Sequence, residues 1–137
     1  MTVLGLDYGE KRIGVAISDE NGSIAFPLLV LQRKNPEDDV RIIQELVQEK
    51  NIERIVVGMP INMNGTRGQK AHEVEIFCEF LKEKIAISVI EWDERLSTMQ
   101  AERVLREAAV SGVKKRAIRD KLASQLILQS YLDARKQ

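Results

Sequence analysis

The chain has little of the side-chain chemistry on which many enzymes depend. Its 137 residues include one cysteine, Cys78, and one histidine, His72. A single cysteine excludes an internal disulfide and a cysteine-rich zinc site. Its helical spacing with Phe77 and Leu81 predicts a small core residue. A histidine base or a catalytic triad would depend entirely on His72, which lies in a polar region, so the sequence argues against that chemistry as well.

Long apolar runs are also missing. The longest apolar stretches, such as IAISVI, are far shorter than a membrane span. No signal-peptide pattern opens the chain, because Asp7 and Glu10 come too early. We therefore expect a cytoplasmic protein without membrane association, with one domain over residues 1–137. Its 21 basic and 21 acidic residues cancel, which argues mildly against bulk electrostatic binding of nucleic acid but allows a local basic rim around an acidic centre.

The first part of the chain has the pattern of three neighbouring strands. Residues 3–7, 12–18 and 23–31 are predicted strands, separated by the turn sequences YGEK and SDENG. An antiparallel meander is the simplest arrangement of three runs so close together. Pro27 in the third run suits an edge strand or a bulge.

The rest of the chain alternates helical and apolar patterns. Proline and acids begin a predicted helix at Pro36, and RIVVGMP and IAISVIEW are short apolar runs that predict buried strands. Further helices are predicted around Phe77, around Val104 and over residues 117–134, with Gly112 ending the second of them and VKKR as a linker. The order β-β-β-α-β-α-β-α-α predicts an α/β fold: a mixed five-stranded sheet with helices on both faces.

Acidic residues occur where such a sheet binds ligands, beyond the carboxyl ends of its parallel strands. Asp7 ends the first strand, Asp93 and Glu94 end the fifth, and Asp120 lies in the first turn of the last helix. Burying several carboxylates together is costly unless a cation cancels their charge. Oxygen ligands suit Mg²⁺ or Mn²⁺, and two such ions about 4 Å apart can activate water for attack on a phosphodiester.

Each of these acids also has an ordinary structural interpretation. Asp7 can satisfy backbone donors in a hairpin turn. Asp93 and Glu94 can be N-terminal acids of a helix, and Asp120 can be a solvated acid paired with nearby cations. Spacing alone leaves both interpretations open.

Four segments, LDYGEKRIGVAISD, IVVGMPINMNGTRG, DERLSTMQAE and DKLASQLILQSYLD, occur in this order along the chain. Together they resemble the YqgF (RuvX-like) family of bacterial proteins, which are described as nucleases of pre-16S ribosomal RNA and were earlier grouped with Holliday-junction resolvases. The resemblance implies an RNase H-like fold and Mg²⁺- or Mn²⁺-dependent hydrolysis of phosphodiester bonds in structured RNA. The implied partner is nucleic acid, with pre-rRNA favoured over branched DNA, and the protein would act as a monomer or homodimer.

The same resemblance implies roles for single residues. Asp7 matches the first metal-binding acid, and Asp120 matches the acid that begins the last helix. The DER segment supplies the second acid, for which we favour Glu94 and hold Asp93 in reserve. The sequence departs from the family at Ser124, where a second alanine is expected.

Basic residues and glycines of the same segments complete the predicted site. The cations are predicted to contact phosphate, and the glycines to let the backbone approach the substrate. Surface solvation or pairing with the acids is the alternative role for the cations, and turn geometry is the alternative for the glycines. These residues are Lys11, Arg12, Arg67, Arg95, Gly58 and Gly65.

Three other functions share part of this pattern. A DNA junction resolvase has the same chemistry and would work as a symmetric dimer. A phosphotransferase of the sugar-kinase and actin class also begins with an Asp-x-Gly hairpin, but it closes two lobes around a nucleotide and 137 residues supply one. A non-catalytic RNA-binding assembly factor would keep the fold and tolerate the loss of Asp7 and Glu94.

Overall fold

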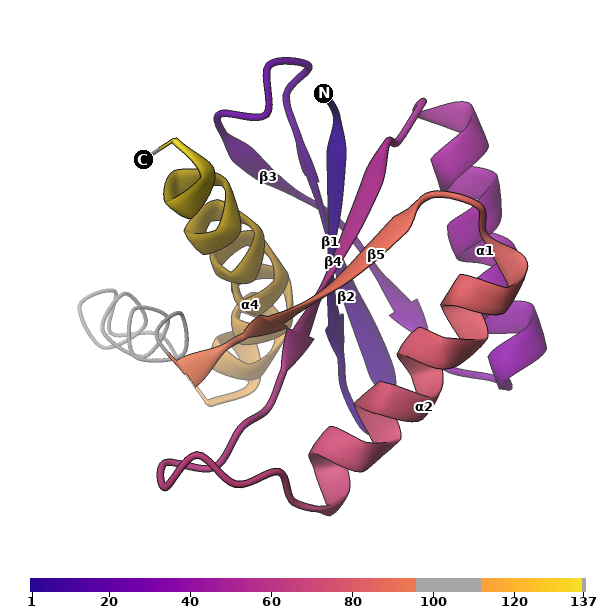
Figure 1. The fold of residues 1–137 in the computed structure, drawn as a ribbon. Coiled ribbons are helices and arrows are strands. Elements are labelled where there is room, and N and C mark those ends of the chain that lie inside the picture. The colour runs from indigo at the N-terminus through magenta and orange to yellow at the C-terminus, as the bar shows by residue number, and fades with distance from the viewer. Residues whose placement is uncertain (96–111, 137) are drawn as a thin grey trace.

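A five-stranded mixed sheet forms the centre of the molecule (Figure 1). The computed structural model describes residues 1–95 and 112–136, with the side chains of 1–95 and 122–136. Strands β1 (Val3–Tyr8), β2 (Arg12–Ser18) and β3 (Ala25–Gln32) form the expected antiparallel meander. Strands β4 (Arg54–Met59) and β5 (Ser88–Asp93) continue the sheet parallel to β1, in the order β3-β2-β1-β4-β5. The predicted mixed sheet is confirmed.

Strand β3 lies at one edge of the sheet, as Pro27 predicted. Pro27 pairs with Ala16, and the register between β2 and β3 shifts between Val15 and Ala16. Proline has no N–H to donate to a neighbouring strand, so an edge position next to an irregularity accommodates it. Both features that the sequence allowed for Pro27 are therefore present.

Helices cover both faces of the sheet. Helices α1 (Pro36–Glu49) and α2 (Gln69–Lys84) lie on one face, and α4 (Gly112–Arg135) lies on the other (Figure 1). The larger core packs α1 and α2 against the sheet and includes Cys78, which is fully buried as predicted. A smaller core under α4 includes Leu128 and Leu132.

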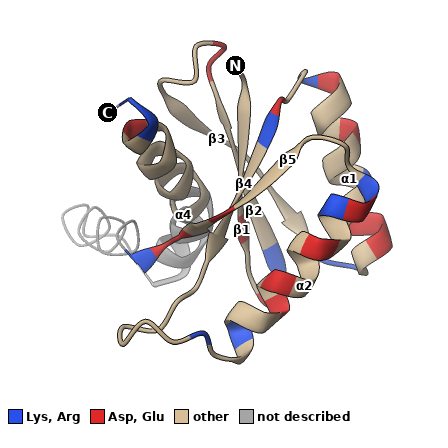
Figure 2. Cartoon of the chain, viewed as in Figure 1, with Lys and Arg blue, Asp and Glu red and all other residues tan. Residues whose placement is uncertain are grey.

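Charge is distributed unevenly over these two faces. Acidic and basic residues follow one another along α1 and α2, whereas residues 122–132 of α4 include neither kind (Figure 2). The described part of α4 instead packs closely on the sheet: a Cβ built at Gly5 of β1 would lie 2.7 Å from Cβ of Leu128. Within the described residues, no helix is long and apolar enough to cross a bilayer.

The start of the last helix differs from the prediction. Helix α4 begins at Gly112, so the segment VKKR is helical and the predicted linker is wrong. Lysine and arginine are good helix formers, and no proline interrupts the segment. The helix predicted around Val104 lies outside the described residues.

Candidate active site

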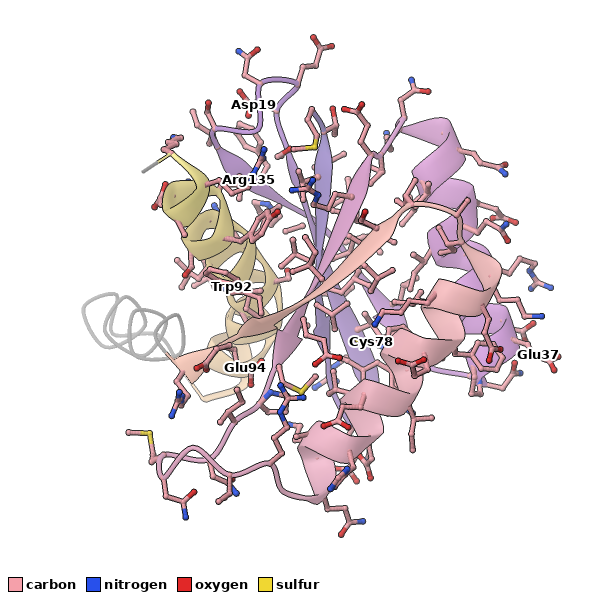
Figure 3. The ribbon with its side chains drawn as sticks, in the orientation of Figure 1. Asp19, Glu37, Cys78, Trp92, Glu94 and Arg135 are labelled. Carbon is pink, nitrogen blue, oxygen red and sulfur yellow. The ribbon has the colours of Figure 1, made fainter. Side chains whose placement is uncertain are left out.

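The sheet brings two of the predicted acids, Asp7 and Glu94, to the same edge. Because β1, β4 and β5 are parallel, their carboxyl ends meet there. Asp7 is the second-last residue of β1, and Glu94 directly follows β5, where its backbone N–H donates to the carbonyl of Met59 over 3.2 Å. The Glu94 carboxylate lies over β4: a Cβ at Gly58 would be 2.8 Å from its Oε2 (Figure 3 labels Glu94).

The surroundings of Glu94 disfavour its negative charge. Burial, followed by the nearby charge of Asp7, raises the pKa of Glu94 from 4.5 to about 7. Asp93 acts in the same direction, and the positive charge of Lys70 lowers the pKa. A partly buried carboxylate repelled by a second one is the arrangement that a bound cation relieves. Its donors are carboxylate oxygens, which fit Mg²⁺ or Mn²⁺.

Asp93 has a different neighbour. The Nε of Arg95 donates to both carboxylate oxygens of Asp93, over 3.1 and 2.9 Å, and its Nη2 donates to Oδ2 over 2.7 Å. The backbone N–H of Arg95 also donates to Asp93 Oδ1, over 3.0 Å. These hydrogen bonds hold the pKa of Asp93 below its usual value. Asp93 and Arg95 thus engage each other, while Glu94 is the residue of the DER segment that lies against Gly58.

Helix α4 carries the third predicted acid, Asp120. Arg54 at the start of β4 donates to Tyr131 over 2.6 Å, whereas Gly58 near the end of β4 approaches Ile127, so α4 runs antiparallel to β4 and to its parallel neighbour β1. Asp120 lies one turn before Ser124 and therefore farther toward the Asp7 end of β1. Its side chain is outside the described set, and its role stays a prediction. Ser124 is fully buried, and its backbone carbonyl would lie 3.3 Å from a Cβ built at Gly5.

Two of the predicted phosphate contacts, Lys11 and Arg12, lie beside Asp7. Lys11 lies in the turn between β1 and β2 and Arg12 is the first residue of β2; a 2.8 Å hydrogen bond from the N–H of Gly9 to the carbonyl of Arg12 closes the turn. Asp7, Lys11 and Arg12 line one hollow of about 170 Å³. The hairpin therefore presents two cations next to the first acid.

Arg67 is placed differently, between α2 and β5. Its Nη1 donates to Glu75 over 3.1 Å and to Glu91 over 3.0 Å. The hydrogen bonds to Glu75 and Glu91 thus fix the position of the Arg67 guanidinium. A contact between Arg67 and phosphate stays a prediction.

The two predicted glycines serve geometry in different ways. Gly58 is buried in β4, where a side chain would collide with Glu94 and with Ile127, so the glycine makes room for the acid and for α4. Gly65 has a φ of +87° in a turn closed by its N–H donating to the carbonyl of Asn62 over 2.8 Å. The predicted approach of substrate to either glycine is untested.

Sequence reasoning missed two cations near the site. Lys70 lies in the first turn of α2 and acts on Glu94. A cation in the first turn of a helix interacts unfavourably with the helix dipole. Its presence in the sequence could therefore have pointed to a role for Lys70. Arg33, directly after β3, donates through Nη1 to the carbonyls of Gly9 and Glu10 over 2.9 and 2.7 Å. No local pattern marks a side chain that reaches back to a turn more than twenty residues earlier.

Comparison with known proteins adds family and fold to this geometry. A family model described as "RuvX: Holliday junction resolvase" matches residues 1–134. A protein of Halothermothrix orenii is 48% identical over 133 residues, covering 97% of this chain and 95% of the relative. A protein of Symbiobacterium thermophilum is 50% identical over 135 residues, covering 98% and 94%. Both relatives are named as candidate pre-16S rRNA nucleases.

Solved structures match over almost the whole chain at low sequence identity. The fowlpox virus resolvase, in complex with its substrate Holliday junction DNA, superimposes with a TM-score of 0.59 at 16% identity and covers 100% of both chains. Thermus thermophilus RuvC, in complex with a Holliday junction substrate, gives a TM-score of 0.57 at 17% identity and covers 99% of this chain and 96% of RuvC. These neighbours confirm the RNase H-like fold.

Proposed function

This chain belongs to the RuvX family, as its four sequence segments predicted, and on that premise we propose that it is a divalent-metal-dependent nuclease that hydrolyses phosphodiester bonds in structured RNA. Its proposed substrate is pre-16S ribosomal RNA. The observation that best supports a catalytic site is the partly buried Glu94, which lies against Gly58 at the same sheet edge as Asp7; burial and the nearby charge of Asp7 raise its pKa to about 7. Like charges held this close destabilise the fold unless a cation neutralises them.

In this proposal each residue of the site has a defined role. Asp7 and Glu94 hold the cation, together with Asp120 as the third acid. A bound divalent cation supplies charge neutralisation and Lewis acidity for hydrolysis of a phosphodiester. Lys11 and Arg12 bind the phosphate groups beside Asp7, which orients the strand but gives little sequence selectivity.

Gly58 and Arg95 shape the second half of the site. Gly58 leaves the space that the Glu94 carboxylate occupies. Arg95 holds Asp93, so that Glu94 remains the acid that shares the cation with Asp7. No group of three metal-ligating side chains occurs within residues 1–95 and 122–136. In this proposal Asp120, whose side chain lies outside that set, completes the site.

The test is cleavage of a precursor 16S rRNA fragment with Mg²⁺ or Mn²⁺ and with EDTA. Wild type should cleave the RNA only with the metal, and Asp7→Asn and Glu94→Gln should each reduce cleavage by about 100-fold or more. Lys82→Ala, at the far end of α2, serves as the matched control and should cleave like wild type. Metal-dependent cleavage that survives Asp7→Asn would refute the site assignment.

A DNA junction resolvase is the second candidate, because the matching family model is described by that activity. A four-way DNA junction in the same assay separates the two functions. Symmetric cutting of the junction, by a protein that is dimeric in solution, would favour the resolvase. Binding of the RNA without cleavage of either substrate would instead favour an RNA-binding assembly factor.

A further inference from the structure

A second hollow, of about 480 Å³, opens next to Glu94 between the loop that follows β4 and the first turn of α2. Its walls include the apolar side chains of Pro60, Ile61, Met63 and Ala71. The volume is within the range of small-molecule sites, about 300–1,000 Å³. Met63, one of the side chains that line this hollow, is 85% exposed and therefore accessible to a ligand.

The loop that forms one wall is held in shape by hydrogen bonds. The backbone N–H of Asn62 donates to the carbonyl of Thr66 over 2.9 Å, and its side-chain amide donates to Thr66 Oγ1 over 3.0 Å. Arg95 Nη1 reaches the carbonyl of Asn62 over 3.4 Å and links the loop to the end of β5. The hollow is therefore preformed rather than produced by a ligand.

Three charged side chains line the hollow, Lys70, Glu94 and Arg95, and Lys70 is the cation that we assign to a phosphate group. Lys70 lies close enough to Glu94 for its positive charge to act on that carboxylate. Gly68 is the N-cap of α2, and the first turn of the helix holds Gln69, Lys70 and Ala71 instead of the acids usual at a helix start. The positive end of the helix dipole and the Lys70 ammonium thus both favour a phosphate group.

We propose that this hollow binds one unpaired nucleotide of the substrate, adjacent to the phosphodiester held at Asp7 and Glu94. The base would contact Ile61, Met63 and the guanidinium plane of Arg95, and its phosphate would lie toward Lys70. Only an unstacked base can enter such a hollow, so the site selects a single-stranded stretch beside the cut. That the neighbouring bond is cut rests on the proposed function, whereas nucleotide binding does not.

The test measures binding apart from cleavage. Fluorescence anisotropy with a labelled single-stranded RNA of about ten nucleotides, in Ca²⁺ in place of Mg²⁺, gives the Kd of each variant. Met63→Ala and Lys70→Ala should each raise the Kd about five- to tenfold. Both side chains are exposed, so thermal unfolding should match wild type.

Matched controls come from the same helix. Ile76→Ala removes an apolar side chain that is 68% exposed, and Lys82→Ala removes a cation from the last turn of α2. Both controls should keep the wild-type Kd within about twofold. A Kd that rises equally in the controls and in the hollow variants, or a wild type that does not bind the RNA, overturns the proposal.

A series of RNAs that each lack one base tests occupancy of the hollow directly. One abasic position should weaken binding by wild type, and Met63→Ala should bind that RNA and the intact RNA alike, because the lost contact is the same. If Met63→Ala remains sensitive to every abasic position that affects wild type, the base does not bind here. If Met63→Ala weakens the binding of duplex RNA as much as it weakens the binding of single-stranded RNA, the requirement for an unpaired nucleotide is refuted.

The outcomes separate this inference from the proposed nuclease activity. If no substrate is cleaved with Mg²⁺ but the abasic effect disappears in Met63→Ala, the nucleotide site stands and the nuclease proposal fails. If RNA is cleaved but Met63→Ala and Lys70→Ala bind like the controls, the nuclease stands and the nucleotide site is refuted.

Discussion

The carboxylate of Glu94 occupies the space that a side chain at Gly58 would fill. A Cβ built on Gly58, in β4, would lie 2.8 Å from Oε2 of Glu94, which follows β5. The same Cβ would lie 2.5 Å from Cδ1 of Ile127 in α4. One glycine therefore sets both the position of an acid and the approach of a helix. The candidate site depends on the packing of three elements that are distant in sequence.

Replacing this glycine should damage the site more than the fold. We expect Gly58→Ala to lower the free energy of unfolding by about 1 kcal/mol, because both close atoms are the ends of side chains that can shift, and to reduce metal-dependent cleavage by displacing the Glu94 carboxylate. Gly5→Ala, in the neighbouring strand, is the control for stability: its Cβ would lie 2.7 Å from the less movable Cβ of Leu128, so it should cost at least as much stability without touching Glu94. Urea unfolding and cleavage rates measure the two effects. Equal loss of activity at equal loss of stability in both variants would contradict a specific role for Gly58.

Glu94 should make the metal-free protein less stable as the pH rises. Its pKa is about 7 in the folded chain against an ordinary 4.5, so the native state binds the proton more tightly than the unfolded chain does. The free energy of unfolding therefore falls between about pH 4.5 and about pH 7. The fall due to Glu94 is on the order of 3 kcal/mol at most. Urea unfolding in EDTA at about pH 5 and about pH 8 measures it.

Two variants identify the cause of this pH dependence. Glu94→Gln should flatten the profile and be more stable than wild type at about pH 8. Asp7→Asn should keep most of the slope, because burial is the larger cause and Asp7 the smaller. Asp93 and Asp19 have lowered pKa values, so their stabilising effects are lost only in more acidic solution. A Glu94→Gln profile as steep as that of wild type would show that another group titrates.

The two neighbouring acids should differ in their effect on catalysis. We expect Glu94→Gln to reduce cleavage by about 100-fold or more, as the loss of a central electrostatic group does. Asp93→Asn should reduce it less than about tenfold and cost about 1 kcal/mol or less of stability, because the pair with Arg95 is partly exposed. Calorimetric titration with Mn²⁺ checks whether affinity follows the same order. Loss of Mn²⁺ binding in Asp93→Asn but not in Glu94→Gln would reverse the assignment.

Arg33 should position the hairpin that carries Lys11 and Arg12. Its guanidinium lies 4.2 Å above the ring of Tyr8 and donates to the carbonyls of Gly9 and Glu10. We expect Arg33→Ala to weaken RNA binding about tenfold and to lower stability by about 1–2 kcal/mol. Arg41→Ala, which removes an exposed arginine of α1 paired with Asp38, is the control. RNA affinity unchanged in Arg33→Ala would show that the hairpin holds its shape without this residue.

Cys78 should be inert in the folded protein. Burial raises the pKa of its thiol to about 12, so almost none of it is thiolate near neutral pH. In the native protein, Cys78 should react with Ellman's reagent only at the rate at which the chain unfolds. In guanidinium chloride, where the chain is unfolded, it should react at once. A fast stoichiometric reaction of native protein would contradict the packing of α2 against the sheet.

Much of the fold could be predicted because its signals are local. Alternating and helical spacings of apolar residues depend on neighbours in sequence, so the strands, α1 and α2 were predictable in order and kind. Pro27 marked the edge strand for the same reason, since proline affects its own backbone pairing. The linker predicted at VKKR failed because Gly112 can end one helix or begin the next, and a local pattern does not distinguish them.

The arrangement of the site had to come from contacts distant in sequence. Asp93 and Glu94 are adjacent in the sequence, and composition gives no reason to choose between them. Their roles separate only in the packed sheet, where Arg95 engages Asp93 and the gap at Gly58 receives Glu94. The raised pKa of Glu94 likewise depends on burial and on Asp7, which lies far away in sequence. The amino-acid sequence thus specifies which strands and helices form, whereas the side-chain environments that create chemistry arise from packing between them.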